Sequence, residues 1–156
     1  MHFVEKQIDR IVISGINTRT CNKTEDNPET AQISDLWRRF YSDELPRVIP
    51  NQTSNFSIYG VYSDFDKEAG GDFTVTVGVE IQNDLEDNMA FPVVVVEPGR
   101  YLMFAVKGPM PESALKTWKE IWEFFSTSKE YTRAFTADFD VYKSQGEVDI
   151  YVSIKY

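Results

Sequence analysis

Two carboxylates and two phenol rings near the C-terminal end of the sequence have a spacing that could bring them together as a cation-binding site. Asp140 precedes Tyr142 by two residues, and Asp149 precedes Tyr151 by two. Residues two apart on a β-strand share a face, so on adjacent strands the four side chains could converge across one hairpin. A carboxylate among aromatic rings is costly until a cation pairs with it, and ring faces attract the same cation. A solvated outer sheet face shows the same alternation, and periodicity alone does not separate the two.

Further candidates lie in the first half of the chain and on one helix. Glu80 lies on the polar face of an alternating strand, and Tyr59 lies on the strand before it. Tyr62, on that same preceding strand, is a weaker candidate. Trp118 and Trp122 belong to an apolar helical stripe, which is more typical of core packing than of ligand contact, although some such rings do both.

Other site chemistry has little support in the sequence. With His2 as the only histidine and Cys21 as the only cysteine, a zinc site of cysteines and histidines, haem ligation and a cysteine–histidine nucleophile pair are not expected. The acidic segment 64–69 resembles the start of a calcium loop, but Ala69 replaces the required glycine and Val75 the bidentate glutamate. No phosphate-binding glycine loop and no Gly-x-Ser-x-Gly turn occurs. We therefore expect no metal and no cofactor.

Length and charge set the class of protein. The chain has 156 residues, the size of one domain. Its formal net charge of −9 favours cations as ligands and argues against direct binding to nucleic acid, which needs clustered basic residues. The first ten residues carry charges and no apolar signal segment, and no stretch approaches the roughly 20 apolar residues of a membrane span. The sequence therefore predicts a cytoplasmic protein without a membrane segment.

Hydrophobic periodicity predicts the elements that must position these residues. Alternating and β-rich runs indicate strands, and apolar residues at i, i+3, i+4 and i+7 indicate helices. Gly15 is expected to close the first strand, residues 17–30 to be turn-rich, and the helices to be capped by Ser34 or Thr30 and by Ser113. The expected strands are 3–13, 56–63, 72–81, two runs around Pro98-Gly99 within 91–108, 138–144 and 147–156, and the expected helices are 33–41 and 113–125.

The two halves of the chain, approximately 1–85 and 90–156, repeat one order of elements. Each half has a strand, a helix with a tryptophan-aromatic stripe, and two strands joined by a polar turn. The match extends to side chains, since residues 60–63 align with residues 140–143. Two such units would pack about a pseudo-twofold axis and leave a groove where they meet, which is the first place to seek a site.

An ordered set of motifs over most of the chain resembles one family. The motifs are Val77-Gly78-Val79-Glu80-Ile81, Glu97-Pro98-Gly99-Arg100-Tyr101, Phe104, Gly108-Pro109, the helix from Trp118 to Phe125, Phe139-Asp140-Val141-Tyr142 and Asp149-Ile150-Tyr151-Val152-Ser153-Ile154-Lys155. The sequence is similar to the GyrI-like small-molecule-binding domain, the effector-binding domain of multidrug-responsive bacterial transcription regulators. The resemblance implies an α+β fold of two pseudo-twofold-related βαββ units, with antiparallel sheets, two main helices and a central ligand groove.

The resemblance also implies roles for particular residues. The family's pocket acid lies in a Phe-Glu-x-Tyr-like segment, which Phe139-Asp140-Val141-Tyr142 matches with an acid shorter by one methylene. Asp140 is therefore the first choice as countercharge for a lipophilic cation and Glu80 the second. Tyr59, Tyr142 and Tyr151 are expected to form the walls.

The chain starts at its first expected strand, so the resemblance implies a stand-alone member of the family without a DNA-binding segment. Three functions are compatible with such a member. The first is uptake of lipophilic cationic or xenobiotic small molecules, with a regulator as a possible protein partner. The second is a hydrolase of strained electrophiles that uses Glu123 and a tyrosine, since Trp122-Glu123 resembles a motif of hydrolytic members. The third is an interaction protein that inhibits gyrase through its acidic surface.

Overall fold

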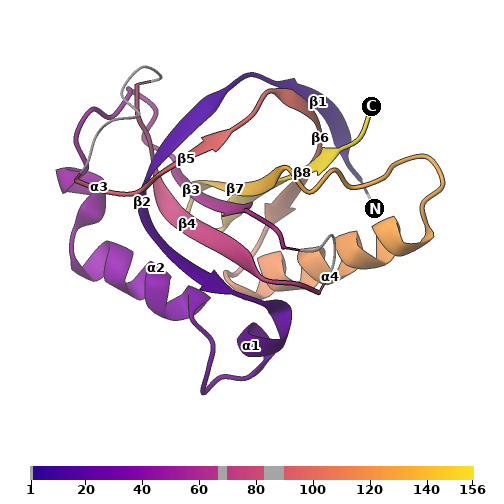
Figure 1. The fold of residues 1–156 in the computed structure, drawn as a ribbon, viewed down its shortest axis with the longest axis horizontal. Helices are drawn as coiled ribbons and strands as arrows, with labels where there is room; N and C mark the ends of the chain where they lie inside the picture. The colour runs from indigo at the N-terminus through magenta and orange to yellow at the C-terminus, as the bar shows by residue number, and fades with distance from the viewer. Residues whose placement is uncertain (1, 67–69, 83–89) are drawn as a thin grey trace.

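The computed structural model describes residues 2–66, 70–82 and 90–156 as one antiparallel sheet with short and long helices (Figure 1). The elements in chain order are β1 (Val4–Ile8), β2 (Ile11–Thr20), α1 (Asn22–Asp26), α2 (Ile33–Ser42), α3 (Leu45–Val48), β3 (Ile58–Ser63), β4 (Phe73–Glu80), β5 (Val93–Val96), β6 (Gly99–Lys107), α4 (Glu112–Thr127), β7 (Ala137–Ser144) and β8 (Glu147–Ile154). The predicted α+β fold of two βαββ units, β2-α2-β3-β4 and β6-α4-β7-β8, is confirmed.

The sheet is curled because of the way its strands are connected. Its strand order is β1-β6-β8-β7-β3-β4-β2-β5, so β1 lies at one end and β2 near the other. Only residues 9 and 10 join β1 to β2, and only residues 97 and 98 join β5 to β6. A link of two residues spans roughly 10 Å at most. The two ends of the sheet must therefore come close together, as Figure 1 shows.

The curl gives the sheet two different faces. On the helix face, α2 packs Leu36 and Phe40 against β4, and α4 packs Ile121 against β6 and β8. On the inner face, side chains from both ends of the sheet fill the inside of the curl. The buried hydrophobic residues of this inner-face cluster are Ile13, Tyr59, Val61, Val96, Tyr101, Ala137 and Phe139.

Strands β3 and β7 pair at the centre of the sheet, where the two βαββ units meet. The strand order is symmetric about this pair, with each short strand, β1 and β5, added to the edge of the other unit. These two added pairings were missing from the sequence prediction. Their partners lie about 95 and 80 residues away in the chain, so local periodicity carries no signal for them.

The first predicted strand differs from the structure in its bounds. Residues 9 and 10 divide it into β1 and β2, and β2 continues through Gly15 to Thr20. The prediction that Gly15 closes the strand was wrong. Gly15 pairs with Gly78 of β4, and a Cβ at position 15 would lie 1.8 Å from the Val77 carbonyl oxygen. Glycine is needed here because two backbones approach closely, not because the strand ends.

The predicted helix caps were also wrong. The Glu25 carboxylate, from α1, accepts hydrogen bonds from the backbone N–H groups of Gln32 and Ile33 at the start of α2, so neither Ser34 nor Thr30 caps it. No side-chain hydrogen bond caps α4, whose first residue is Glu112. A carboxylate at a helix N-terminus satisfies free amides in the same way as a local cap, but its distance in sequence hides it from capping rules.

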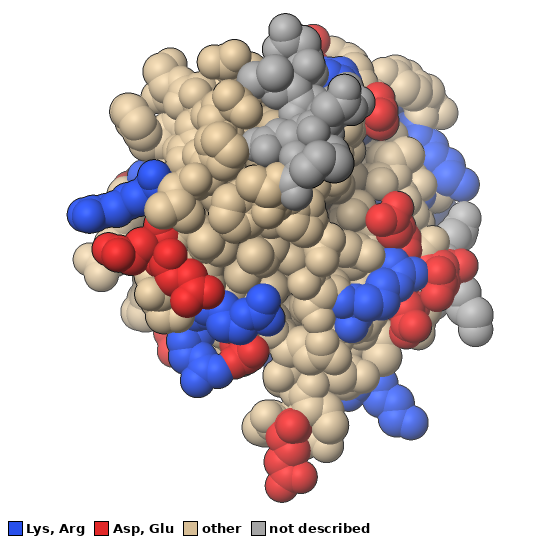
Figure 2. Space-filling view, turned by 60° about the vertical axis from the view of Figure 1, so that its left-hand side comes forward, with Lys and Arg blue, Asp and Glu red and all other residues tan. Residues whose placement is uncertain are grey.

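None of the helices in the described ranges is long and apolar enough to cross a membrane. On the face of the molecule in Figure 2, acidic and basic side chains lie next to one another. No large basic patch stands out among the described residues on that face.

Candidate ligand-binding site

A buried acid lies at the centre of the helix face, where the two βαββ units meet. Asp140 of β7 is 1% exposed and pairs across the strands with Gly60 of β3. A Cβ at position 60 would lie 3.4 Å from Trp37 Cζ2 and 3.9 Å from Asp140 Oδ2. These are ordinary van der Waals distances, and they place both the Trp37 ring and the acid directly over Gly60.

The Asp140 carboxylate is incompletely satisfied. The Tyr62 hydroxyl donates to Asp140 Oδ2 at 3.1 Å. Asp140 Oδ1 and the indole Nε1 of Trp118 are both buried, and neither has a hydrogen-bond partner among the described residues. Burial raises the pKa of Asp140 to about 7. The hydrogen bond from Tyr62 opposes this rise in pKa, and the nearby charge of Asp138 adds to it. The Trp118 indole and the Tyr142 phenol, both close to the carboxylate, also oppose the rise in pKa. A buried carboxylate with an unpaired oxygen favours the binding of a cation.

Aromatic rings surround this acid, and they come from both units. Tyr142 of β7 lies edge-on to Trp37 of α2 at 4.8 Å between ring centroids. Tyr62 of β3 lies edge-on to Trp118 of α4 at 5.6 Å. Burial and the charge of Asp140 raise the pKa of the Tyr142 phenol, so it stays neutral and can donate a hydrogen bond. Each edge-on pair therefore joins a strand of one unit to the helix of the other.

A cavity of about 550 Å³ lies beside these rings on the helix face, between the start of α2 and the side of α4 that carries Trp118 and Trp122. Tyr62 and Trp118 line it and also surround Asp140, so the cavity and the acid share a wall. The other aromatic lining residues are Phe65, Phe73, Trp122, Phe125, Tyr131 and Phe135. This lining suits a ligand with several aromatic rings.

A buried ion pair forms part of the cavity wall. Asp138 of β7 is 1% exposed, and Arg133 Nη2 donates to its Oδ2 at 2.5 Å. Ser153 donates to the other oxygen of Asp138 through its backbone N–H at 3.0 Å and through its hydroxyl at 3.2 Å. Burial raises the pKa of Asp138, and Arg133 opposes that rise. Asp138 therefore has the partners that Asp140 lacks.

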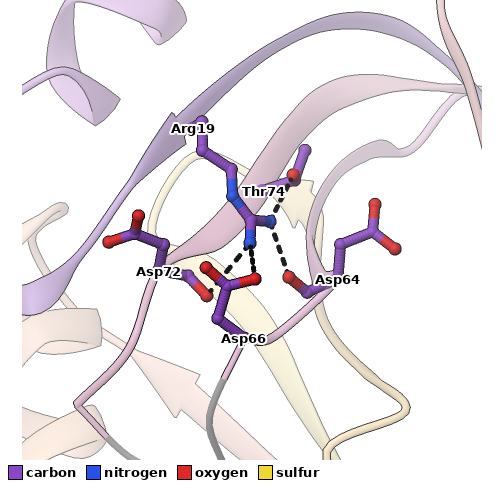
Figure 3. A network of polar contacts seen from close by, with 5 residues as sticks. All are labelled: Arg19, Asp64, Asp66, Asp72 and Thr74. Atoms are coloured by element: carbon purple, nitrogen blue, oxygen red, sulfur yellow. Dashed lines mark hydrogen bonds and ion pairs between the residues drawn. The ribbon is translucent and has the colours of Figure 1, made fainter.

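A polar network holds the β3–β4 connection in place at the cavity (Figure 3). Arg19 of β2 donates through Nη1 to the Asp64 carbonyl oxygen at 2.6 Å and to Thr74 Oγ1 at 2.9 Å, and through Nη2 to Asp66 Oδ1 at 2.7 Å. Phe65 lies within this connection and lines the cavity. The described part of the acidic turn 64–69 thus contacts a guanidinium, while residues 67–69 lie outside the described range.

The second predicted acid and tyrosine pair lies on the opposite side of the sheet. Asp149 pairs with Val141, and Tyr151 with Phe139, so both side chains point to the inner face while Asp140 points to the helix face. The prediction that the two pairs converge was wrong, because the register offsets them by one residue. Asp149 instead forms an ion pair with Lys143 at 3.2 Å.

The other predicted site residues that the structure places on the inner face make polar and ring contacts within the protein. The Asn55 amide donates to the Tyr59 hydroxyl at 2.8 Å and to Glu80 Oε1 at 2.9 Å. Tyr151 stacks on Phe139 with 4.5 Å between ring centroids and 7° between ring planes. The structure therefore brings Asp140, Tyr142, Trp118 and Trp122 together on one face and separates them from Tyr59, Glu80, Asp149 and Tyr151.

The residue that the hydrolase alternative requires does not reach the cavity. Glu123 is exposed on α4, and it is absent from the cavity lining although its neighbour Trp122 is present there. Consecutive residues of a helix point in directions about 100° apart. Among the described residues, no group of three or more His, Cys, Asp or Glu side chains is placed to hold a metal.

Sequence reasoning underestimated two residues of the site. Tyr62 was a weaker candidate, and Trp37 was not among the residues predicted to bind a ligand. The alignment of residues 60–63 with 140–143 carried a usable signal, because it places Tyr62 in the position of Tyr142. Trp37 offered no such signal, since a ring on a helical stripe looks the same whether it packs in a core or beside a site.

A curled antiparallel sheet with two helices on one face, and a buried acid among aromatic rings beside a cavity, defines a protein of the GyrI-like effector-binding class. Residues 6–154 match the Cass2 family model, described as an integron-associated effector binding protein, and the chain belongs to this family.

Known relatives agree with this assignment. YobU of Bacillus subtilis (strain 168), described as a candidate transcriptional regulator protein, is 30% identical over 149 residues, which cover 91% of each chain. The crystal structure of an integron cassette protein from the mobile metagenome of Vibrio cholerae superposes with a TM-score of 0.82 and 28% identity, over 98% of this chain and 95% of that one. SAV2435, solved bound to tetraphenylphosphonium, superposes with a TM-score of 0.79 over 99% and 94% of the chains at 17% identity, which is a likeness of fold.

Proposed function

We propose that the protein binds lipophilic, aromatic cations in the cavity on the helix face, with Asp140 as the countercharge. The observation that carries this proposal is the unpaired Asp140 Oδ1, buried beside an aromatic cavity. Family membership and the tetraphenylphosphonium bound to SAV2435 support it. The natural ligands would then be hydrophobic cationic xenobiotics.

The geometry supports a cation rather than an anion or a neutral ring compound. A cation would recover the electrostatic stabilisation that Asp140 lost on burial, whereas an anion would add a second uncompensated charge. The rings of Tyr62 and Trp118 lie between the cavity and the acid, where their faces can contact the positive charge. Asp140 is not itself among the lining residues, so its charge would act on the ligand across the Tyr62 and Trp118 side chains, whose rings contact the same positive group.

The decisive experiment compares two probes of nearly equal size and opposite charge. Tetraphenylphosphonium and tetraphenylborate are titrated into the protein, and tryptophan fluorescence follows binding, because Trp118 and Trp122 line the cavity. We expect saturable binding of the phosphonium and at least about tenfold weaker binding of the borate.

Two matched variants locate the countercharge. Asp140→Asn should abolish the preference for the cation, and Asp149→Asn, the same substitution on the inner face, should preserve it. Loss of the preference in Asp149→Asn alone would move the site to the inner face. Equal binding of both probes by the wild type would contradict the proposal.

A further inference from the structure

The wall of the proposed site contains two buried acids that differ in their partners. Asp138 and Asp140 are two residues apart on β7, so both point to the helix face, and each is 1% exposed. Asp138 has a guanidinium partner and two hydrogen bonds from Ser153. Among the described residues, Asp140 accepts a hydrogen bond from Tyr62, lies close enough to Trp118 and Tyr142 for both to lower its pKa, and has no cationic partner.

Arg133 is held firmly enough to act as a fixed charge. Its side chain is only 14% exposed, its guanidinium lies 4.1 Å above the Phe135 ring, and it contacts Asp138 at 2.5 Å. Arg133, Phe135 and Asp138 all line the cavity. A ligand in the cavity would therefore meet the positive charge of Arg133 as well as the negative charges of the acids.

The other charged groups that line the cavity are placed differently. Asp26 and Lys119 are exposed, so water screens them. Glu25 is partly buried, and its carboxylate is engaged by the amides at the start of α2. Among the described residues, the buried charges in and beside the cavity wall are thus two carboxylates and one guanidinium, which leave one negative charge uncompensated.

We propose that Arg133 limits the site to ligands with one positive charge, because it neutralises Asp138 and leaves Asp140 as the one buried countercharge within the described part of the chain. This inference rests on the proposed function. A monovalent cation would balance Asp140. A divalent cation of the same shape would leave one buried positive charge without a partner, and Arg133 would repel it.

A pair of flat probes tests this directly. N-methyl-4-phenylpyridinium and N,N′-dimethyl-4,4′-bipyridinium have nearly the same size and shape and carry one and two positive charges. Isothermal titration calorimetry at pH 8.5 measures both affinities with Asp140 ionised. We expect the wild type to bind the monovalent probe at least about tenfold more tightly.

Two variants identify Arg133 as the cause. Arg133→Gln should remove most of the preference for the monovalent probe, because it leaves Asp138 free to pair with a second positive charge. The double variant Asp138→Asn with Arg133→Gln again leaves one acid, and it should restore the wild-type preference. The double variant also avoids a buried unpaired charge, so it keeps the test decisive if Arg133→Gln does not fold.

The outcomes separate this inference from the proposed function. If the wild type binds both probes equally and Asp140→Asn binds neither, the site is a cation site but the limit on charge is wrong. A double variant that loses the preference would also overturn the role of Arg133. If the wild type binds neither flat probe and no tetraphenylphosphonium, the proposed function itself fails.

Discussion

The two faces of the sheet carry the same residue types, but these residues have different surroundings. On the inner face, Asp149 is paired with Lys143, and Tyr151 is stacked on Phe139. On the helix face, Asp140 is more deeply buried than Asp149, yet one of its oxygens has no partner among the described residues, and a cavity opens beside it. The inner face thus pairs its acid with a cation of the protein, and the helix face leaves its acid a contact for a ligand.

This difference shows which observation distinguishes a site from a core. Acids and tyrosines in alternation occur on both faces, so residue type and spacing do not decide between them. Incomplete satisfaction of a buried carboxylate does, because folded proteins leave few buried polar groups, and charged ones least of all, without a structural or functional reason. The comparison predicts that substitutions on the inner face change stability and that those on the helix face change binding.

The largest expected effect is a loss of folding stability caused by a substitution on the inner face. Phe139→Ala should lower the free energy of unfolding by about 3–5 kcal/mol, because the ring is 1% exposed and contacts Tyr59, Tyr101 and Tyr151. Phe125→Ala, the same change in the cavity wall, should cost less than about half of that, since its ring is only partly buried. Denaturant unfolding measures the free energy of unfolding of both variants. Equal losses would contradict the contrast between a closely packed inner face and a helix face with a cavity.

The second effect is a stability gain from removing the site's acid. Because the pKa of Asp140 is raised from 3.8 to about 7, the folded state binds more protons than the unfolded state between these values, and its stability falls as pH rises through that window. At pH 8 the full cost is present and amounts to about 4 kcal/mol. Asp140→Asn should therefore be more stable than the wild type at pH 8 by up to this amount, and the gain should vanish near pH 4.

Unfolding curves from pH 4 to pH 8 on both proteins test this prediction. A variant that is less stable than the wild type at pH 8 would mean that the carboxylate contributes to folding, as acids on a purely structural face do. That result would weaken the contrast between the faces.

A third effect concerns the pH dependence of binding. Only the ionised form of Asp140 pairs with a cation, so with a pKa of about 7 the affinity for tetraphenylphosphonium should rise about tenfold from pH 6 to pH 8 and then level off. The probe has a permanent charge, so it does not titrate. Asp140→Asn should show a flat profile in the same fluorescence titration, and a sloping one would assign the dependence to another group.

A fourth and smaller effect tests the cavity wall. Glu25→Ala removes the acceptor for the first amides of α2 and should lower the free energy of unfolding by about 1 kcal/mol. Glu25→Gln keeps a carbonyl acceptor and serves as the control. Thermal or denaturant unfolding distinguishes them, and an equal loss in both would mean that the negative charge matters more than the hydrogen bonds.

The sequence was sufficient to predict the fold and to point to part of the candidate site. Helical stripes and alternation located α2, α4 and the six strands of the two units, and the segment around Asp140 was identified by its motif. The inner-face assignments of Asp149 and Tyr151 were beyond reach, because a one-residue register choice reverses every side chain of a strand. Arg133 was missed because it lies outside regular strands and helices and because an ion pair between residues 133 and 138 has no periodic signal.

The smallest expected effect is the one that tests the comparison most closely. Glu80 was predicted as the second countercharge, but it lies on the inner face, where Asn55 and Thr53 donate to its carboxylate. Glu80→Gln should therefore change the affinity for tetraphenylphosphonium by no more than about twofold, because distant sites without shared partners act independently. A tenfold loss in the fluorescence titration, with unfolding unchanged, would show that the inner face also takes part in binding. It would then follow that a carboxylate with local hydrogen bonds can still bind a ligand. Hydrogen-bond satisfaction of the acids would then not be enough to tell the binding face from the packed face.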